Sequence, residues 1–135
     1  MSVEVVVAEN GQGRYQQEVT VGQHRFIADE PINVGGADGG PSPFDFLMSA
    51  LGACTSMTLR MYAERKDLKL SRISVALSHD KTDVDGIQRD RISRQITLEG
   101  ELSASERLRL LDIANKCPVH RALSQPLLIA SSLVE

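Results

Sequence analysis

The stretch Ser42–Lys66, which reads SPFDFLMSALGACTSMTLRMYAERK, decides the fold of this chain. It opens with the pattern of a helix start. Ser42 is placed to cap the helix, Pro43 occupies the first helical position, and Asp45 stands at the third. This capping box predicts that a helix begins at Pro43.

The body of this helix is apolar or small on every side. No charged residue follows Asp45 until Arg60, which is typical of a helix that is surrounded by protein. A charged last turn then ends it. We expect one central helix from Pro43 to about Lys66, about 36 Å long, with Cys54 near its middle.

The segments before this helix have the character of strands. Residues 3–8, 14–21 and 24–29 are β-branched or alternating runs separated by glycine-containing turns, so an antiparallel meander is the simplest prediction. Residues 29–43 follow with four glycines and three prolines. We expect that stretch to be a loop with neither helix nor central strand, and ordered loops of this length are often functional.

A second pair of strands is predicted after the central helix. Residues 71–83 and 91–102 alternate between apolar and polar side chains, and a polar loop around Asp85-Gly86 joins them. The charged stretch at residues 85–94, which includes the start of the second strand, is expected to be a solvated face of the hairpin.

Two helices and a strand are predicted for the rest of the chain. Residues 103–106, SASE, form another capping box. One apolar stripe of the helix that follows is expected to contain Leu108, Leu111, Ala114 and Cys117. Pro118 should end that helix and begin a short one through residues 119–123. The apolar run at residues 127–134 is interpreted as a closing strand.

Composition limits the classes of function. A chain of 135 residues that is 41% hydrophobic suits a single domain, residues 1–135. The net charge of -3, the absence of a basic block and the 4% aromatic content argue against nucleic acid as a partner. Neither a charged leader nor a long apolar run is present, so we expect a cytoplasmic protein that does not enter membranes.

The chain has two cysteines, Cys54 and Cys117, too few for a disulfide scaffold. In a reducing compartment such a pair is more often catalytic, redox-sensing or metal-binding than structural. The alternative is that each is a buried core filler, because free cysteine packs as a small hydrophobe. The small residues Gly52, Ala53, Thr55 and Ser56 would leave room beside Cys54, and Leu51 and Met57 would suit an apolar substrate.

The motifs GGADGGPSPFDFLMSALGACTSMTLRMYAERK, residues 35–66, and ANKCPVHRAL, residues 114–123, resemble the OsmC/Ohr family of osmotically inducible and organic hydroperoxide resistance proteins. The resemblance implies an α+β fold with antiparallel sheets around the long helix, and an intertwined homodimer. It also implies reduction of organic hydroperoxides with a dithiol as reductant. By position, Cys54 matches the peroxidatic cysteine and Cys117 the resolving cysteine.

The resemblance also implies a cation and a carboxylate that activate Cys54. Family members take the arginine from the N-terminal β region, and both Arg14 and Arg25 are candidates that no spacing distinguishes. The family acid stands ten residues before the cysteine, where this chain has Phe44. Asp45 stands nine before, which on a regular helix places it half a turn away and about 13 Å along the axis. That spacing favours a capping role for Asp45.

Three other interpretations remain. Cys54 and Asp45 could join Cys117 and His120 as zinc ligands, although one Cys-x-x-His pair falls short of the two pairs usual in structural sites, and we expect no metal or other cofactor. A Cys-His hydrolase would need an orienting group that the sequence does not indicate, so the histidines are expected to be ordinary. The main rival to the peroxidase is a homodimer that binds a small apolar ligand without useful thiol chemistry.

Overall fold

The computed structural model describes residues 4–134, which belong to two compact units divided between Leu47 and Met48. The first unit contains a three-stranded antiparallel sheet in the order β1-β2-β3. Its strands are β1, Val6–Glu9, β2, Gln17–Val21, and β3, His24–Ala28. The predicted meander is confirmed for these residues, while Val3, the first residue of the predicted run, lies outside the described part.

The glycine-rich loop after β3 is held in place by Asp29. Its buried carboxylate accepts backbone N–H groups from Glu30 at 2.7 Å and Gly39 at 3.0 Å. A Cβ atom at Gly40 would collide with the Ile27 carbonyl, so this position requires glycine. The prediction that the loop contains no helix was wrong for one turn, because Ile32–Val34 forms the short 3₁₀ helix η1.

The long helix predicted from the sequence is α1, Pro43–Arg65. Its capping box forms as expected: the Asp45 carboxylate accepts the Ser42 backbone N–H at 3.0 Å, and Ser42 Oγ accepts the Asp45 backbone N–H at 3.4 Å. These bonds satisfy donors that a helix start leaves without partners in the helix itself. None of the helices between residues 4 and 134 combines the length and apolar character needed to cross a bilayer.

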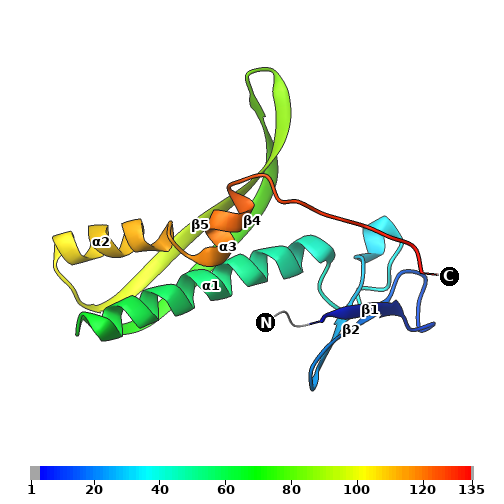
Figure 1. Cartoon of the computed structure of the whole chain (residues 1–135), viewed down its shortest axis with the longest axis horizontal. Helices are drawn as coiled ribbons and strands as arrows, with labels where there is room; N and C mark the ends of the chain where they lie inside the picture. The colour runs from blue at the N-terminus through cyan, green and yellow to red at the C-terminus, as the bar shows by residue number, and fades with distance from the viewer. Residues whose placement is uncertain (1–3, 135) are drawn as a thin grey trace. The chain divides into compact units, whose positions relative to one another are not determined.

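The second unit is built on a long hairpin of β4, Lys69–Val84, and β5, Ile87–Glu101, which Figure 1 shows as a twisted ribbon. Val84 pairs directly with Ile87, so the turn consists of Asp85 and Gly86 alone. Their φ angles are 52° and 79°, the left-handed values that a type I′ turn needs and that Asp-Gly favours. The predicted hairpin is therefore confirmed, with both strands extending further than expected.

Two further helices follow the hairpin, α2, Ala104–Ala114, and α3, Pro118–Leu123. Both start as the sequence predicts. Ser103 and Glu106 form the complete capping box of α2, with bonds of 3.1 Å and 2.8 Å. Pro118 occupies the first turn of α3, immediately after Cys117.

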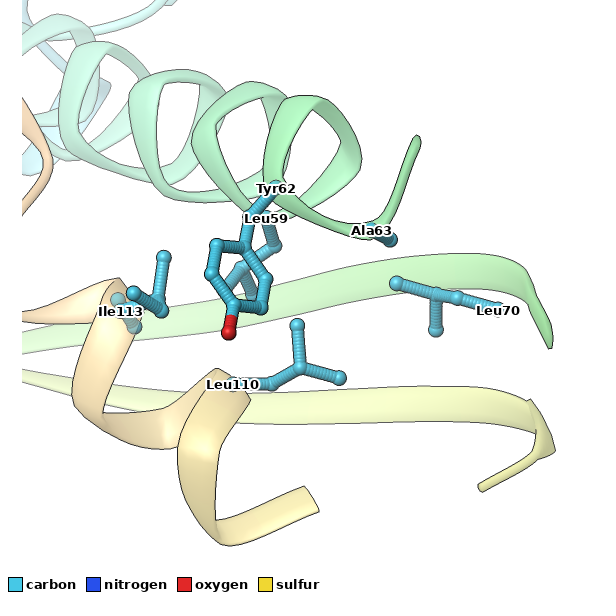
Figure 2. Close-up of a cluster of buried hydrophobic side chains, with 7 residues drawn as sticks. Leu59, Tyr62, Ala63, Leu70, Leu110 and Ile113 are labelled. Carbon is cyan, nitrogen blue, oxygen red and sulfur yellow. The ribbon is translucent and has the colours of Figure 1, made fainter. Parts of the chain in front are cut away.

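The main core lies where α1, α2 and β4 meet (Figure 2). Its buried side chains come from the second half of α1, the start of β4 and one face of α2: Leu59, Tyr62, Ala63, Leu70, Leu110, Ile113 and Ala114. The predicted α2 stripe was mostly wrong. Ala114 is buried, but Leu108 and Leu111 are 69% and 55% exposed, and Cys117, although buried, lies beyond the end of α2. Leucines at 108, 110 and 111 allow two stripes, and packing against α1 selects the one through Leu110.

Two other expectations fail for the single chain. Residues 127–134 do not form a strand, because among the described residues no sheet edge pairs with them. The helix α1 is also not surrounded by protein on all sides. It buries Leu51, Thr55 and Leu59, whereas Met57 and Met61 on its other side are 61% and 63% exposed. The fold class is nevertheless the one predicted, α+β with antiparallel sheets and a long helix.

Candidate functional site

Cys117 occupies a fully buried position at the start of α3. Its Sγ accepts the backbone N–H of His120 at 3.3 Å, so the thiol serves as the helix cap. The side chain of Thr55 approaches from α1, with Thr55 Oγ1 3.9 Å from Cys117 Sγ. Cys117 therefore contacts α1 at Thr55, the residue next to Cys54.

This contact brings the two cysteines close together although 62 residues separate Thr55 from Cys117. Both thiols are free. They differ in access, because Cys117 is buried while Cys54 is only partly covered. An approaching molecule can therefore reach Cys54 more easily than Cys117.

Arg94 of β5 forms hydrogen bonds to four residues around Cys117. Its Nη1 donates to Thr55 Oγ1 at 2.8 Å and to the Ala114 carbonyl at 3.2 Å. Its Nη2 donates to Asn115 Oδ1 at 3.1 Å and meets His120 Nδ1 at 2.9 Å. One guanidinium thus connects β5 with α1, the end of α2, and α3.

The bond to Arg94 fixes the state of His120. Burial, and then the positive charge of Arg94, lower the pKa of the imidazole below its ordinary value of 6.5. His120 is therefore neutral at pH 7. Since a guanidinium can only donate, Nδ1 must be the acceptor and the ring proton lies on Nε2. His120 is a partly buried residue of α3, so it is not the surface or strand histidine that we expected, and that it is no catalytic base stays a prediction. His79 lies on the hairpin and pairs with Asp90 at 2.9 Å.

The small residues around Cys54 serve packing more than access. Gly52 is buried, and a Cβ atom there would lie 2.8 Å from Leu77 Cδ1, so glycine leaves room for the Leu77 side chain of β4. Thr55 is buried against Cys117 and Arg94. Of the four small neighbours, Ala53 and Ser56 remain at least partly exposed.

The apolar neighbours of Cys54 also differ from expectation. Leu51 is buried, whereas Met57 is exposed. Cys54, Met57 and Met61 stand three and seven residues apart and so share one stripe of α1. The partly covered thiol therefore lies beside two exposed methionine side chains.

The candidate activating residues all lie in the first unit. Arg25 on β3 pairs with Glu18 at 3.5 Å and is largely exposed. The Arg14 guanidinium lies 4.9 Å from the ring centre of Tyr15. Asp45 is engaged in the capping box of α1. The roles assigned to these residues stay predictions.

The zinc interpretation has no geometric support in the described part of the chain. Within residues 4–134, no three His, Cys, Asp or Glu side chains are grouped so that they could hold a metal ion. The Cys117-x-x-His120 pattern instead places the His120 backbone N–H on the thiol and the ring on Arg94.

The sequence analysis does not identify Arg94 as a residue of the site, because it assigns residues 85–94 to a solvated face of the hairpin. A usable signal was present. Ile92, Arg94, Ile96 and Leu98 alternate with exposed residues, so they share the partly buried face of β5. A charged residue within such an apolar row needs buried partners, and that requirement could have identified it.

Comparisons with known proteins agree with this architecture. The model of the OsmC-like protein family matches residues 35–132. No functionally curated protein matches the chain.

Solved structures extend the comparison over most of the chain. An OsmC-like protein from Mycoplasma pneumoniae is similar with a TM-score of 0.76 at 19% identity, over 92% of this chain and 88% of that one. The organic hydroperoxide resistance protein OsmC of Legionella pneumophila gives 0.70 at 17%, over 91% and 89%. The organic hydroperoxide resistance protein OhrB of Bacillus subtilis gives 0.65 at 17%, over 94% and 93%.

Proposed function

Because the chain belongs to the OsmC-like protein family, we propose that it is a thiol peroxidase that reduces organic hydroperoxides through Cys54 and Cys117, in defence against oxidative stress. Two of the similar structures are of organic hydroperoxide resistance proteins, which supports the substrate class. The observation that carries the proposal is the contact of Thr55 with Cys117, since it brings the helix turn that holds Cys54 against the second thiol.

In the first step the Cys54 thiolate attacks the terminal oxygen of the hydroperoxide. The O–O bond breaks, the alkoxide takes a proton and leaves as the alcohol, and Cys54 becomes a sulfenic acid. This step needs an accessible thiol, and Cys54 is only partly covered.

In the second step Cys117 attacks the sulfur of the sulfenic acid. The S–S bond forms, the S–O bond breaks, and the hydroxide leaves as water with the proton from Cys117. An external dithiol then reduces the disulfide and restores both thiols. A reducing compartment supplies such dithiols, and we place the protein in the cytoplasm.

Activation of Cys54 would need a nearby cation, because Cys54 lies about three turns from the start of α1, beyond the reach of the helix dipole. Arg14 and Arg25 remain the candidates. If one of them serves, replacing it with glutamine should slow the first step, and replacing the other should not. Wild-type rates of the first step in both variants would remove the N-terminal arginines from the mechanism.

The proposed assembly is an intertwined homodimer. The exposed methionine stripe of α1 leaves apolar surface uncovered in one chain. Covering it with a second copy would remove that surface from water, which is the dominant favourable contribution to most protein association.

The decisive test is stopped-flow oxidation of the reduced protein by a lipid-like hydroperoxide and by hydrogen peroxide, followed by mass spectrometry of both cysteines. We expect faster reaction with the bulky peroxide and a Cys54–Cys117 disulfide as product. If neither peroxide oxidises Cys54, thiol catalysis is excluded and the homodimer that binds an apolar ligand takes its place.

A further inference from the structure

The hydroxyl of Thr55 has one proton and three neighbours. It lies 2.7 Å from the Leu51 carbonyl, 2.8 Å from Arg94 Nη1 and 3.9 Å from Cys117 Sγ. The carbonyl can only accept and the guanidinium can only donate. When the hydroxyl donates to Leu51, its lone pairs are left for Arg94 and for the S–H of Cys117. In this arrangement Cys117 is a thiol and the donor.

The Thr55 hydroxyl can also form a hydrogen bond to Cys117 after the cysteine has lost its proton. If the thiol is deprotonated, the Thr55 hydroxyl can rotate away from Leu51 and donate to Cys117 Sγ instead. The cost to Leu51 is small, because in a regular α-helix its carbonyl also accepts the backbone N–H of Thr55. The His120 backbone N–H, 3.3 Å from Sγ, is a second donor that is already in place.

Arg94 keeps this hydroxyl in position in both states. Its guanidinium is fixed from the far side by Asn115 Oδ1 and by His120 Nδ1. The bond from Nη1 withdraws electron density from Thr55 Oγ1, which makes the hydroxyl a better donor to sulfur. Both Thr55 and Cys117 are fully buried, so solvent water cannot donate a hydrogen bond to Cys117 Sγ in place of the Thr55 hydroxyl.

We propose that Arg94 and Thr55 act as a hydroxyl relay that positions Cys117 and stabilises its thiolate during disulfide formation. The proposal rests on the peroxidase function above and deepens its second step. The Cys117 thiolate attacks the sulfur of the Cys54 sulfenic acid, the S–S bond forms, and hydroxide leaves with the proton that Cys117 gave up. Arg94 and Thr55 are positioning residues, since neither touches the peroxide.

A matched pair of substitutions tests the hydroxyl. Thr55→Val keeps the shape and removes the hydroxyl, whereas Thr55→Ser keeps the hydroxyl. Each reduced protein is mixed with one equivalent of an organic hydroperoxide, and quenched samples are analysed for sulfenic acid at Cys54 and for disulfide. In Thr55→Val the second step should fall at least about tenfold more than the first, the effect of one lost hydrogen bond, and should depend more steeply on pH. Thr55→Ser should restore both the rate and the pH profile.

A second pair tests the charge. Arg94→Met should slow disulfide formation in the same way, while Arg91→Met, on the same strand and paired with Asp80 at 2.7 Å, should not. Thermal melting of both variants shows whether they are folded. Disulfide formation in Thr55→Val and Arg94→Met at the wild-type rate and pH profile would overturn the relay.

A third measurement does not depend on catalysis. In a Cys54→Ser background Cys117 is the sole cysteine of the chain, so its thiolate absorbs in the ultraviolet together with the two ionised tyrosines, Tyr15 and Tyr62. Subtracting the spectrum of a variant that lacks both cysteines leaves the absorbance of the Cys117 thiolate. At a fixed alkaline pH the thiolate fraction should be lower with Thr55→Val than with Thr55→Ser, and equal fractions would contradict the relay. If peroxide yields neither sulfenic acid nor disulfide at Cys54 of the wild type, the peroxidase proposal fails, and this measurement alone decides the relay.

Discussion

Arg94 Nη1 donates a hydrogen bond to Thr55 Oγ1 at 2.8 Å, which joins β5 to the turn of α1 that carries Cys54. The two residues are 39 positions apart in the chain. Because Thr55 also contacts Cys117, this bond connects a partly buried charge with the second thiol. The surroundings of the cysteine pair are therefore set by strand β5 as well as by the two segments that hold the thiols.

Replacing Cys54 and replacing Cys117 should have different effects on the reaction with peroxide. Cys54→Ser should abolish peroxide consumption, because the first step needs the attacking thiolate. Cys117→Ser should react once and stop as a sulfenic acid at Cys54 that dimedone traps, with no turnover on addition of a dithiol. Mass spectrometry after a single addition of peroxide distinguishes the two. If both variants consume peroxide like wild type, the pair is not catalytic.

The protein should be a homodimer in solution. Met57 and Met61 expose more than half of their surface on a helix that is free of charge from Phe46 to Leu59, and a second copy would bury them. Sedimentation equilibrium at micromolar concentration should give about twice the chain mass. A mass near the 14.8 kDa of one chain would contradict this prediction.

Asp45→Asn should leave most of the peroxide rate intact. The carboxylate accepts the Ser42 backbone N–H, a role that an asparagine oxygen can fill, so the free energy of unfolding should fall by at most about 1 kcal/mol. Ser42→Ala removes the other half of the same capping box and should have a similar effect on stability. A hundredfold loss of rate in folded Asp45→Asn alone would instead assign the carboxylate to catalysis.

Asp29 should make the glycine-rich loop sensitive to acid. The Gly39 backbone N–H above all, with further help from Glu30 and Gln16, holds the pKa of this carboxyl below its ordinary value of 3.8. A lowered pKa stabilises the fold at pH values above 3.8, and this contribution is lost as the pH falls through the folded-state pKa. Asp29→Asn should therefore be less stable than wild type at neutral pH, and the difference should shrink below pH 3.8. Denaturant unfolding at several pH values measures it, and a difference that does not depend on pH would contradict the assignment.

Neighbouring leucines of α2 should differ in their contribution to stability. Leu110 is fully buried in the core, so Leu110→Ala should lower the free energy of unfolding by about 2–5 kcal/mol. Leu108 is 69% exposed, and Leu108→Ala should change it by less than about 0.5 kcal/mol. Denaturant unfolding of both variants checks the pair, and equal losses would restore the stripe expected from the sequence.

Much of the fold could be predicted because its signals are local. The Ser42 and Ser103 capping boxes, the Asp85-Gly86 turn and Pro118 each act on their nearest neighbours in the chain, and each lies where the sequence places it. Hydrophobic pattern was less reliable. Residues 127–134 are apolar enough for a strand, but a strand also needs a neighbouring strand to pair with. The sequence of these residues does not tell whether such a partner is within reach.

Some features of the candidate site also follow from local sequence, while others depend on tertiary contacts. The sequence by itself determined that Cys54 lies in the middle of a long helix and that Cys117 precedes the short helix begun by Pro118, because helix starts and stops depend on adjacent residues. Only the tertiary structure decided that Thr55 faces Cys117 and that Arg94 holds Thr55 and His120. These bonds join elements 26 to 62 residues apart, and they exist only after β5, α1 and α3 have packed together. A hydrogen bond requires partners within about 3 Å, and at such separations the order of residues does not fix which atoms come that close.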